Sequence, residues 1–223
     1  MGIAGMPAIS TDLFKKNFTT TPRTISAEVR AFCQRISPDQ TPAYVPVSED
    51  AGVLPSECFN NVASKVERDG GTLLYGWLIW EWPRVFVEAE HHAVWEHDGI
   101  LTDITPHVNG ERQVLFLPDP MRPYDFATQK RLINIKRSLG ELPSVGGWIA
   151  ATNKLHHAIE ANSVGNQFTL ERSYLSAMGQ EIRNALGLVF VDLAKTTGPN
   201  APCFCTSGRK FKKCCGPMIQ IYP

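Results

Sequence analysis

Four of the six cysteines in this 223-residue chain lie within thirteen consecutive positions near its C-terminal end. They form two close pairs, Cys203-Phe204-Cys205 and Cys214-Cys215, with eight residues between the pairs. Zn²⁺ prefers four soft or borderline ligands at the corners of a tetrahedron, and thiolates supply them. Two close pairs joined by a short loop can therefore surround one ion without a hydrophobic core. The alternatives are two disulfides or free thiols, but a chain without an export signal favours the metal.

The loop between the two cysteine pairs suits a metal cassette. Gly208 permits a backbone turn there. Four thiolates around one Zn²⁺ leave excess negative charge, which nearby cations can offset. The loop supplies the cations Arg209, Lys210, Lys212 and Lys213.

This segment resembles the SEC-C motif, a zinc module first noted at the C-terminus of the bacterial SecA translocation ATPase and appended to many other bacterial proteins. The similarity is carried by Pro202, Ser207-Gly208, Phe211 between basic residues, and Cys214-Cys215-Gly216. Thr206 stands where the family usually has Gly, a departure that leaves the ligands untouched. The resemblance implies Zn²⁺ held by Cys203, Cys205, Cys214 and Cys215, and docking to a protein partner or a ribosome.

The composition excludes several classes of protein. Hydrophobic residues make up 43% and charged residues 20%, which is typical of a globular protein rather than a disordered one. The formal net charge is zero, so we expect neither a nucleic-acid partner nor a membrane surface. No apolar run approaches the length of a membrane span, and the first residues do not read as a signal peptide. We therefore expect a cytoplasmic protein in which Cys33 and Cys58 are free thiols.

A second chemical candidate is Cys58, which the pattern places in the first turn of a helix. Ser56 is a plausible N-cap, and a stripe at helical spacing follows, made of Phe59, Val62, Ala63 and Val66. The free N–H groups and the dipole of a helix start stabilise an anion, so they favour a nucleophilic thiolate. The alternative is that Cys58 is a small buried apolar residue. Asn60 and Asn61 could donate to an oxyanion or make only local contacts.

The segment from 88 to 106 predicts a hairpin with Asp98-Gly99 as its two-residue turn. In that register His97 faces Ile100 and Trp95 faces Thr102. Side chains alternate along strands, so His92, Val94, Asp103 and Thr105 share one face and His91 points to the other. His92 is thus the histidine that an orienting carboxylate can reach, as a diagonal neighbour of Asp103.

A Cys, a His and an Asp that holds the imidazole form the general arrangement of thiol acyl-transfer enzymes. The Cys at a helix start, the run His92-Ala93-Val94-Trp95 and the run Asp103-Ile104-Thr105-Pro106 are similar to the transglutaminase-like branch of papain-fold cysteine enzymes. The hairpin here is shorter than in many members. The resemblance implies Cys58 as nucleophile, His92 as base and Asp103 as orienter, acting on an amide or ester as a hydrolase or acyltransferase. The alternative is a non-enzymatic adaptor with an inactive central domain.

The remaining pattern predicts the elements that must position these residues. We expect strands at 73–80, 85–95, 100–105 and 113–117, and helices at 25–36, 125–139, 148–161 and around a stripe from Leu175 to Leu193. Helix, meandering strands and then helices indicate an α+β fold. With the resemblance, we expect a papain/transglutaminase-like domain over residues 1–198. Gly198-Pro199-Asn200 leads into a small zinc module over residues 199–223.

Overall fold

An antiparallel sheet forms the centre of the computed structural model, which describes residues 7–165 and 167–220. Its strands are β2 (Ala43–Pro46), β3 (Thr72–Trp82), β4 (Phe86–His97), β5 (Ile100–Thr102), β6 (Gln113–Pro118) and β7 (Ile135–Ser138). The spatial order is β2-β6-β3-β4-β5, and β7 also pairs with β4. Two short two-stranded pairs lie outside this sheet: β1 (Ala8–Ile9) with β10 (Ile219–Gln220), and β8 (Ser163–Val164) with β9 (Gln167–Phe168). The architecture is α+β, as the sequence predicts.

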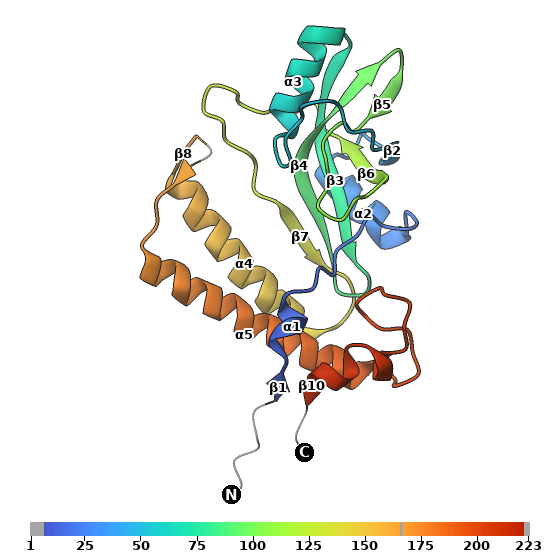
Figure 1. Cartoon of the computed structure of the whole chain (residues 1–223), viewed down its shortest axis with the longest axis vertical. Helices are drawn as coiled ribbons and strands as arrows, with labels where there is room; N and C mark the ends of the chain where they lie inside the picture. Colours follow the sequence, from blue (N-terminus) through green and yellow to red (C-terminus); the bar gives the residue numbers. More distant parts are fainter. Residues whose placement is uncertain (1–6, 166, 221–223) are drawn as a thin grey trace, which may run out of the picture.

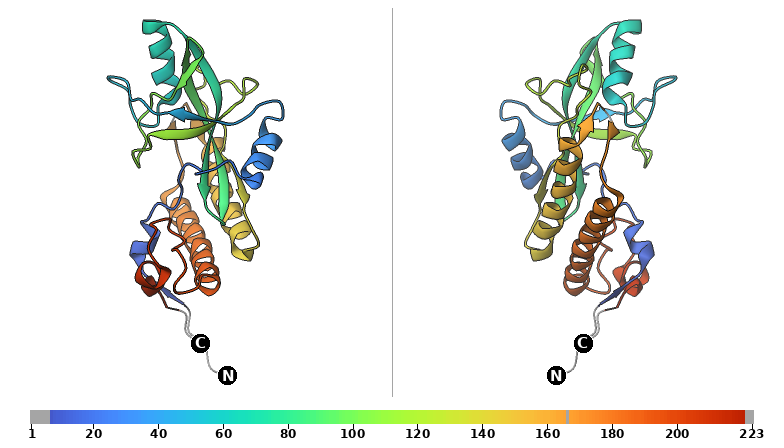
Figure 2. Two further views of the ribbon diagram at one scale, coloured as in Figure 1. Left: turned by 90° about the vertical axis from the view of Figure 1, so that its right-hand side faces the viewer. Right: turned by 90° about the vertical axis from the view of Figure 1, so that its left-hand side faces the viewer.

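Some helices pack against the sheet, and others lie beyond one end of it (Figure 1). They are α1 (Thr11–Phe14), α2 (Ala27–Ile36), α3 (Cys58–Asp69), α4 (Pro143–Ala161), α5 (Arg172–Thr196) and the 3₁₀ turns Phe211–Lys213 and Gly216–Met218. α3 packs on β4. The long helices α4 and α5 lie side by side at the end of the molecule away from α3, next to the Cys-rich segment (Figures 1 and 2).

The two edges of the sheet meet, so the sheet curls back on itself. Asp103, just after β5, bridges Val47, just after β2, in parallel register. Asp103 N–H donates to the Pro46 carbonyl at 3.0 Å, and Ser48 N–H donates to the Asp103 carbonyl at 2.8 Å. The enclosed face holds a cluster of Val45, Leu78, Val94, Val114 and Phe116. This closure brings the Asp103 segment beside the inward face of β4.

β3 and β6 approach closely at Gly76. A Cβ at this position would lie 2.2 Å from the Leu117 carbonyl oxygen and 2.6 Å from the Phe116 ring. Only glycine fits there, because such distances are far inside van der Waals contact. Gly76 is also the partner of His92 in the β3–β4 register.

β4 has a gap along its outer edge. β7 pairs with residues 86–89 and β5 with residues 95–97, so residues 90–94 have neither strand beside them there. The predicted hairpin register is confirmed, because His97 pairs with Ile100 and Trp95 with Thr102. β5 ends at Thr102, three residues earlier than predicted, because Asp103 turns away to bridge Val47. The gap leaves His92 accessible to groups from other segments.

The helix predicted at residues 125–139 is wrong. The Asp125 side chain accepts from the N–H groups of Ala127 and Thr128, which is a local turn that competes with a helix. Gln129 has a positive φ of 53°, and residues 135–138 then pair with β4 as β7. The other four predicted helices are present, at α2, α3, α4 and α5.

The Cys-rich segment and the sheet-bearing part share one hydrophobic cluster. Phe204, Phe211 and Cys215 pack with Trp82 of β3 and Phe190 of α5. The Trp82 indole N–H also donates to the Phe204 carbonyl at 2.9 Å. Residues 198–200 are exposed, as expected of a joint, and the boundary at 198/199 stays a prediction. The Cys-rich segment after residue 200 therefore forms part of the hydrophobic core that contains Trp82 and Phe190.

Among residues 7–165 and 167–220, no helix is both long enough and apolar enough to cross a membrane.

Candidate active site and metal centre

Cys58 is the first residue of α3, and its side chain is buried. Ser56, predicted as the N-cap, is not the cap. Its φ of 62° is left-handed, whereas a capping Ser requires extended backbone. Glu57 takes the position and makes no side-chain capping bond. No side chain therefore satisfies the first-turn N–H groups around Cys58, and those groups can serve an anion.

His92 and Asp103 meet as the hairpin register predicts. His92 Nε2 lies 3.1 Å from Asp103 Oδ2, and both side chains are almost completely buried. Cys58 lines the same pocket as His92, and the Cys58 thiol contributes to the raised pKa of that imidazole. Since Nε2 faces Asp103, Nδ1 is the ring nitrogen left for the thiol. The three predicted residues are thus brought together in the order Cys, His, Asp.

His107 is a fourth member of this group, and the sequence reasoning missed it. Its Nε2 lies 2.8 Å from the same Asp103 Oδ2 that faces His92. Asp103 Oδ1 accepts from the Thr105 N–H at 2.9 Å. Both oxygens of a fully buried carboxylate are therefore occupied. The available signal was His107 standing four residues after Asp103, beyond Thr105-Pro106.

Burial and the neighbouring charged groups have opposite effects on the pKa values of His92 and Asp103, and the charged groups together have the larger effect. Burial lowers the pKa of His92, but the neighbouring Cys58 and Asp103 raise it, so that its pKa lies well above the ordinary value. Burial raises the pKa of Asp103, but His92 and His107 hold that pKa far below the ordinary value. The arrangement therefore favours a protonated His92 beside an ionised Asp103.

Asp103→Asn is expected to lower the free energy of unfolding at pH 7 by about 1.5–3 kcal/mol, the range for hydrogen bonds to a charged group. A folded-state pKa below the unfolded value stabilises the protein above the unfolded pKa of about 4, and this contribution is lost as the pH falls through the folded pKa. Urea unfolding at pH 5 and pH 3.5, where His92 is protonated in both the folded and the unfolded state, should show a smaller deficit at pH 3.5 than at pH 5. A deficit that does not change with pH would contradict the ionised carboxylate.

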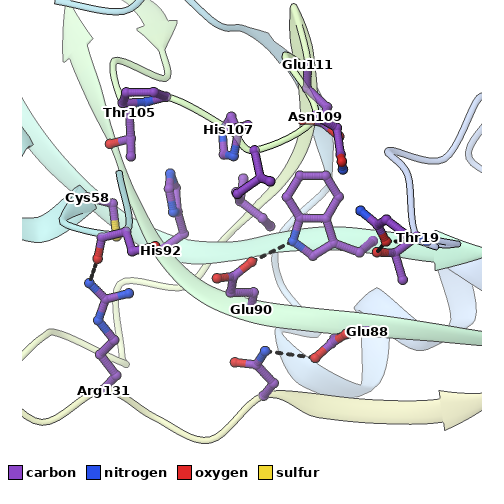
Figure 3. A pocket seen from close by; sticks show the side chains of 17 residues that line it. Thr19, Cys58, Glu88, Glu90, His92, Thr105, His107, Asn109, Glu111 and Arg131 are labelled. Atoms are coloured by element: carbon purple, nitrogen blue, oxygen red, sulfur yellow. Dashed lines mark hydrogen bonds between the residues drawn. The ribbon is translucent and has the colours of Figure 1, made fainter. Parts of the chain in front are cut away.

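Cys58 and His92 line a pocket of about 250 Å³ at the gap in β4. Figure 3 shows Cys58, His92, Thr105 and His107 gathered at one side of it. The remaining wall comes from β3, β4, the 105–111 segment and the 131–134 segment. Arg131 donates to the Ser56 carbonyl and stands beside Cys58 (Figure 3). The thiol is buried from bulk solvent yet faces a cavity that a substrate group can enter.

His91 points to the opposite face of β4, as predicted. Its Nε2 donates to the Arg122 carbonyl at 2.8 Å, and its Nδ1 accepts from the Leu132 N–H at 3.3 Å. Both ring nitrogens are therefore engaged, which requires the neutral tautomer. Burial, the largest cause, lowers the pKa of His91 and agrees with this state. His91 thus holds the 122–132 segment against β4 and does not contact the group formed by Cys58, His92 and Asp103.

Asn61 connects the helix of Cys58 to the segment of Asp103. Its amide bonds to both the N–H and the carbonyl of Leu54 and donates to Thr105 Oγ1 at 3.2 Å. Asn60 donates to the Glu57 carboxylate at 2.8 Å. Neither amide is free to serve an oxyanion, so the local-contact alternative describes both. The α3 N–H groups remain as the candidate donors.

His92, Asp103 and His107 also place three donor atoms within 4.8 Å of one another, which could hold a metal ion. In the observed geometry, however, both imidazole Nε2 atoms lie at hydrogen-bond distance from one carboxylate oxygen. Each Nε2 then carries a proton directed at Asp103 and has no lone pair for an ion. The hydrogen bonds satisfy this group without a metal.

The four C-terminal cysteines form the second group of donors. Their Sγ atoms all lie within 4.8 Å of one another, and Cys205 Sγ is 3.4 Å from Cys214 Sγ. Four thiolates bound to one ion at about 2.3 Å would lie about 3.8 Å apart, so the cluster fits a tetrahedral site. Cys203, Cys205 and Cys215 are buried. No disulfide links these cysteines.

The backbone conformation at Thr206 shows why glycine is the usual residue at this position of the motif. Thr206 has a φ of 60°, a left-handed conformation that favours glycine, the residue usual at this position in the motif. Gly208 is also left-handed, at 74°. The Arg209 guanidinium donates to the Lys213 carbonyl at 2.6 Å and so closes the loop across its base.

The SEC-C motif matches residues 200–217, the segment that carries all four cysteines. No curated protein and no solved structure matches the chain. The C-terminal segment is therefore assigned to a known motif with a cysteine cluster that could bind a metal. The rest of the chain has its geometry as the only guide to function.

Proposed function

We propose that this protein is a cysteine-dependent hydrolase or acyltransferase that acts on an amide or ester through Cys58, His92 and Asp103. The observation that carries the proposal is that Cys58 of α3 and His92 of β4 line one pocket, and that the buried Asp103, just after β5, lies 3.1 Å from the His92 ring. The helix-start Cys on a curled antiparallel sheet also supports the predicted papain/transglutaminase-like fold. A location in the reducing cytoplasm would keep the Cys58 thiol from forming a disulfide.

Each residue has a distinct part in this reaction. His92 holds the proton of the Cys58 thiol as an imidazolium, and the thiolate attacks the acyl carbon, helped by the α3 N–H groups that stabilise the oxyanion. The acyl–nitrogen or acyl–oxygen bond then breaks, His92 returns the proton to the leaving group, and a thioester remains. Water or an amine releases the acyl group. Asp103 holds the imidazole, and His107 lies at hydrogen-bond distance from the same Asp103 oxygen.

Selective alkylation tests this proposal, since the chain carries an internal reference thiol. Cys33 is buried among apolar residues, and burial raises its pKa to about 12. Iodoacetamide at pH 7 should label Cys58 at least about a hundredfold faster than Cys33, as read by peptide mass spectrometry. Equal labelling of the two thiols would leave the adaptor as the better account.

We also propose that the metal is zinc, bound by Cys203, Cys205, Cys214 and Cys215, and that the module docks a protein partner. Elemental analysis of protein purified without added metal should find one zinc per chain, and Cys214→Ser should abolish it. His107→Gln is the control, because it should leave the zinc content unchanged. Two equivalents per chain, one of them lost in His107→Gln, would show that the histidine group also binds metal.

A further inference from the structure

The pocket beside Cys58 is lined by three carboxylates, from Glu88, Glu90 and Glu111. Glu88 is accounted for within the protein. Its Oε1 lies 2.7 Å from the Lys136 ammonium and accepts from the Asn134 amide at 2.8 Å. The charge of Glu88 is therefore compensated by Lys136. Glu90 and Glu111 differ from Glu88 in their hydrogen-bond and ion-pair partners.

Glu90 and Glu111 have no such ion-pair partner among the described residues, although Arg131 and His107 line the same pocket. In residues 7–165 and 167–220, neither forms an ion pair with a lysine, an arginine or a histidine. Glu90 Oε2 accepts only the neutral indole N–H of Trp80, at 2.7 Å. Glu111 Oε1 accepts the neutral amide of Asn109 at 3.0 Å.

One oxygen in this wall lacks a partner. Glu111 Oε2 is buried and accepts no hydrogen bond from any part of the chain that the structure describes. A buried carboxylate oxygen without a donor is costly, so such an atom points to a group that is supplied from outside the chain. A donor that also carries positive charge would satisfy both the hydrogen bond and the excess charge.

The geometry favours an organic cation over a metal ion. Among the described residues, two groups of side chains lie close enough together to share one metal ion. Neither group includes a carboxylate of this pocket. A guanidinium or ammonium group carries several N–H donors and can bridge carboxylates that are further apart. Trp80 lies on the same wall, and an indole face attracts such cations.

We propose that Trp80, Glu90 and Glu111 form a subsite for a guanidinium or ammonium group of the substrate. This inference rests on the proposed function, because the cation would be carried by the amide or ester that reaches Cys58. Figure 3 shows Glu90 between the Cys58 end of the pocket and the Glu111 end, and the Trp80 indole donates to Glu90. The substrate class is then an acyl compound with a cationic side arm that extends away from Cys58.

A matched series of thiol reagents tests the subsite. Three chloroacetamides are compared, with a butyl chain that ends in a guanidinium, a methyl or a carboxylate group. In each, the Cys58 thiolate displaces chloride, so the reaction is the same and only the tail differs. The guanidinium compound should react about tenfold faster than the neutral one, and the carboxylate compound should be slowest.

Isosteric variants locate the effect. Glu90→Gln and Glu111→Gln should each reduce the guanidinium-to-methyl rate ratio several-fold. Glu160→Gln is the control. It removes the same charge from a neighbouring cavity and should leave the ratio as it is. A ratio near one in the unmodified protein, or a high ratio that survives both variants, would overturn the subsite.

A binding measurement keeps this result separate from the fate of Cys58. Calorimetry on Cys58→Ser should detect butylguanidinium and no binding of pentanoate, with butylguanidinium affinity reduced about tenfold in Glu90→Gln or Glu111→Gln backgrounds. If the neutral chloroacetamide does not label Cys58 but butylguanidinium binds as described, the proposed reaction fails and the cation subsite stands. Absence of butylguanidinium binding would overturn the subsite, whatever the reactivity of Cys58.

Discussion

Replacing His92 with alanine is expected to slow iodoacetamide labelling of Cys58 at pH 7 by about thirtyfold or more, because an unassisted cysteine is only a few per cent thiolate at that pH. In the intact protein the imidazole next to Cys58 carries a proton readily, since Cys58 and Asp103 raise the pKa of His92 against the effect of burial. The imidazolium stabilises the thiolate. Without it, the thiol has only the α3 N–H groups.

His91→Ala is the matched control for this variant, because it removes the same ring from the adjacent position. His91 occupies the other face of β4 and bonds to Arg122 and Leu132. We expect lower thermal stability and a change of less than about threefold in Cys58 labelling. Equal slowing in the two variants would mean that the histidines act through folding alone and that His92 has no special role.

Phe204→Ala is expected to cost about 3–5 kcal/mol in the free energy of unfolding, although Phe204 lies in the C-terminal module. Phe204 is buried against Trp82 and Phe190, and its carbonyl accepts the Trp82 indole N–H. Removing the ring leaves a cavity in a cluster that reaches into the sheet and α5. Urea unfolding followed by circular dichroism measures the loss for the whole chain.

Phe168→Ala is the control, since the same ring in β9 is 46% exposed and should matter by no more than about 0.5 kcal/mol. If the four cysteines bind the proposed zinc, a chelator should also destabilise the whole chain, because three of these cysteines are buried at the same cluster. If Phe204→Ala and the chelator both leave the sheet-bearing part at full stability, the module folds independently of the core.

The features predicted correctly from sequence depend on short-range chemistry. The Asp98-Gly99 turn fixes the hairpin register, and strand alternation then assigns His92 and His91 to opposite faces. The cysteine spacing likewise locates the cysteine cluster that could hold a metal ion, because close pairs need only one turn between them. In each case a few neighbouring residues determine the geometry.

The features that were missed depend on contacts between distant segments. Residues 135–138 become a strand because β4 offers a free edge, which nothing within the segment reveals. His107 joins Asp103 because the Val47 bridge ends β5 and turns the chain. Phe204 enters the core through Trp82, which stands 122 positions earlier in the chain. Periodicity and spacing carry no information on such pairings.

The pH dependence of Cys58 alkylation tests the thiol–imidazole pair most directly. Rates at Cys58 should be measured from pH 6 to pH 9 in the intact protein, with His92→Ala beside it. If His92 holds the proton of the thiol, the intact protein should show a shallow curve, with less than about a threefold rise over this range, whereas His92→Ala should rise about tenfold per pH unit at the acidic end. An intact protein whose rate climbs as steeply as that of the variant would contradict the Cys58–His92–Asp103 site.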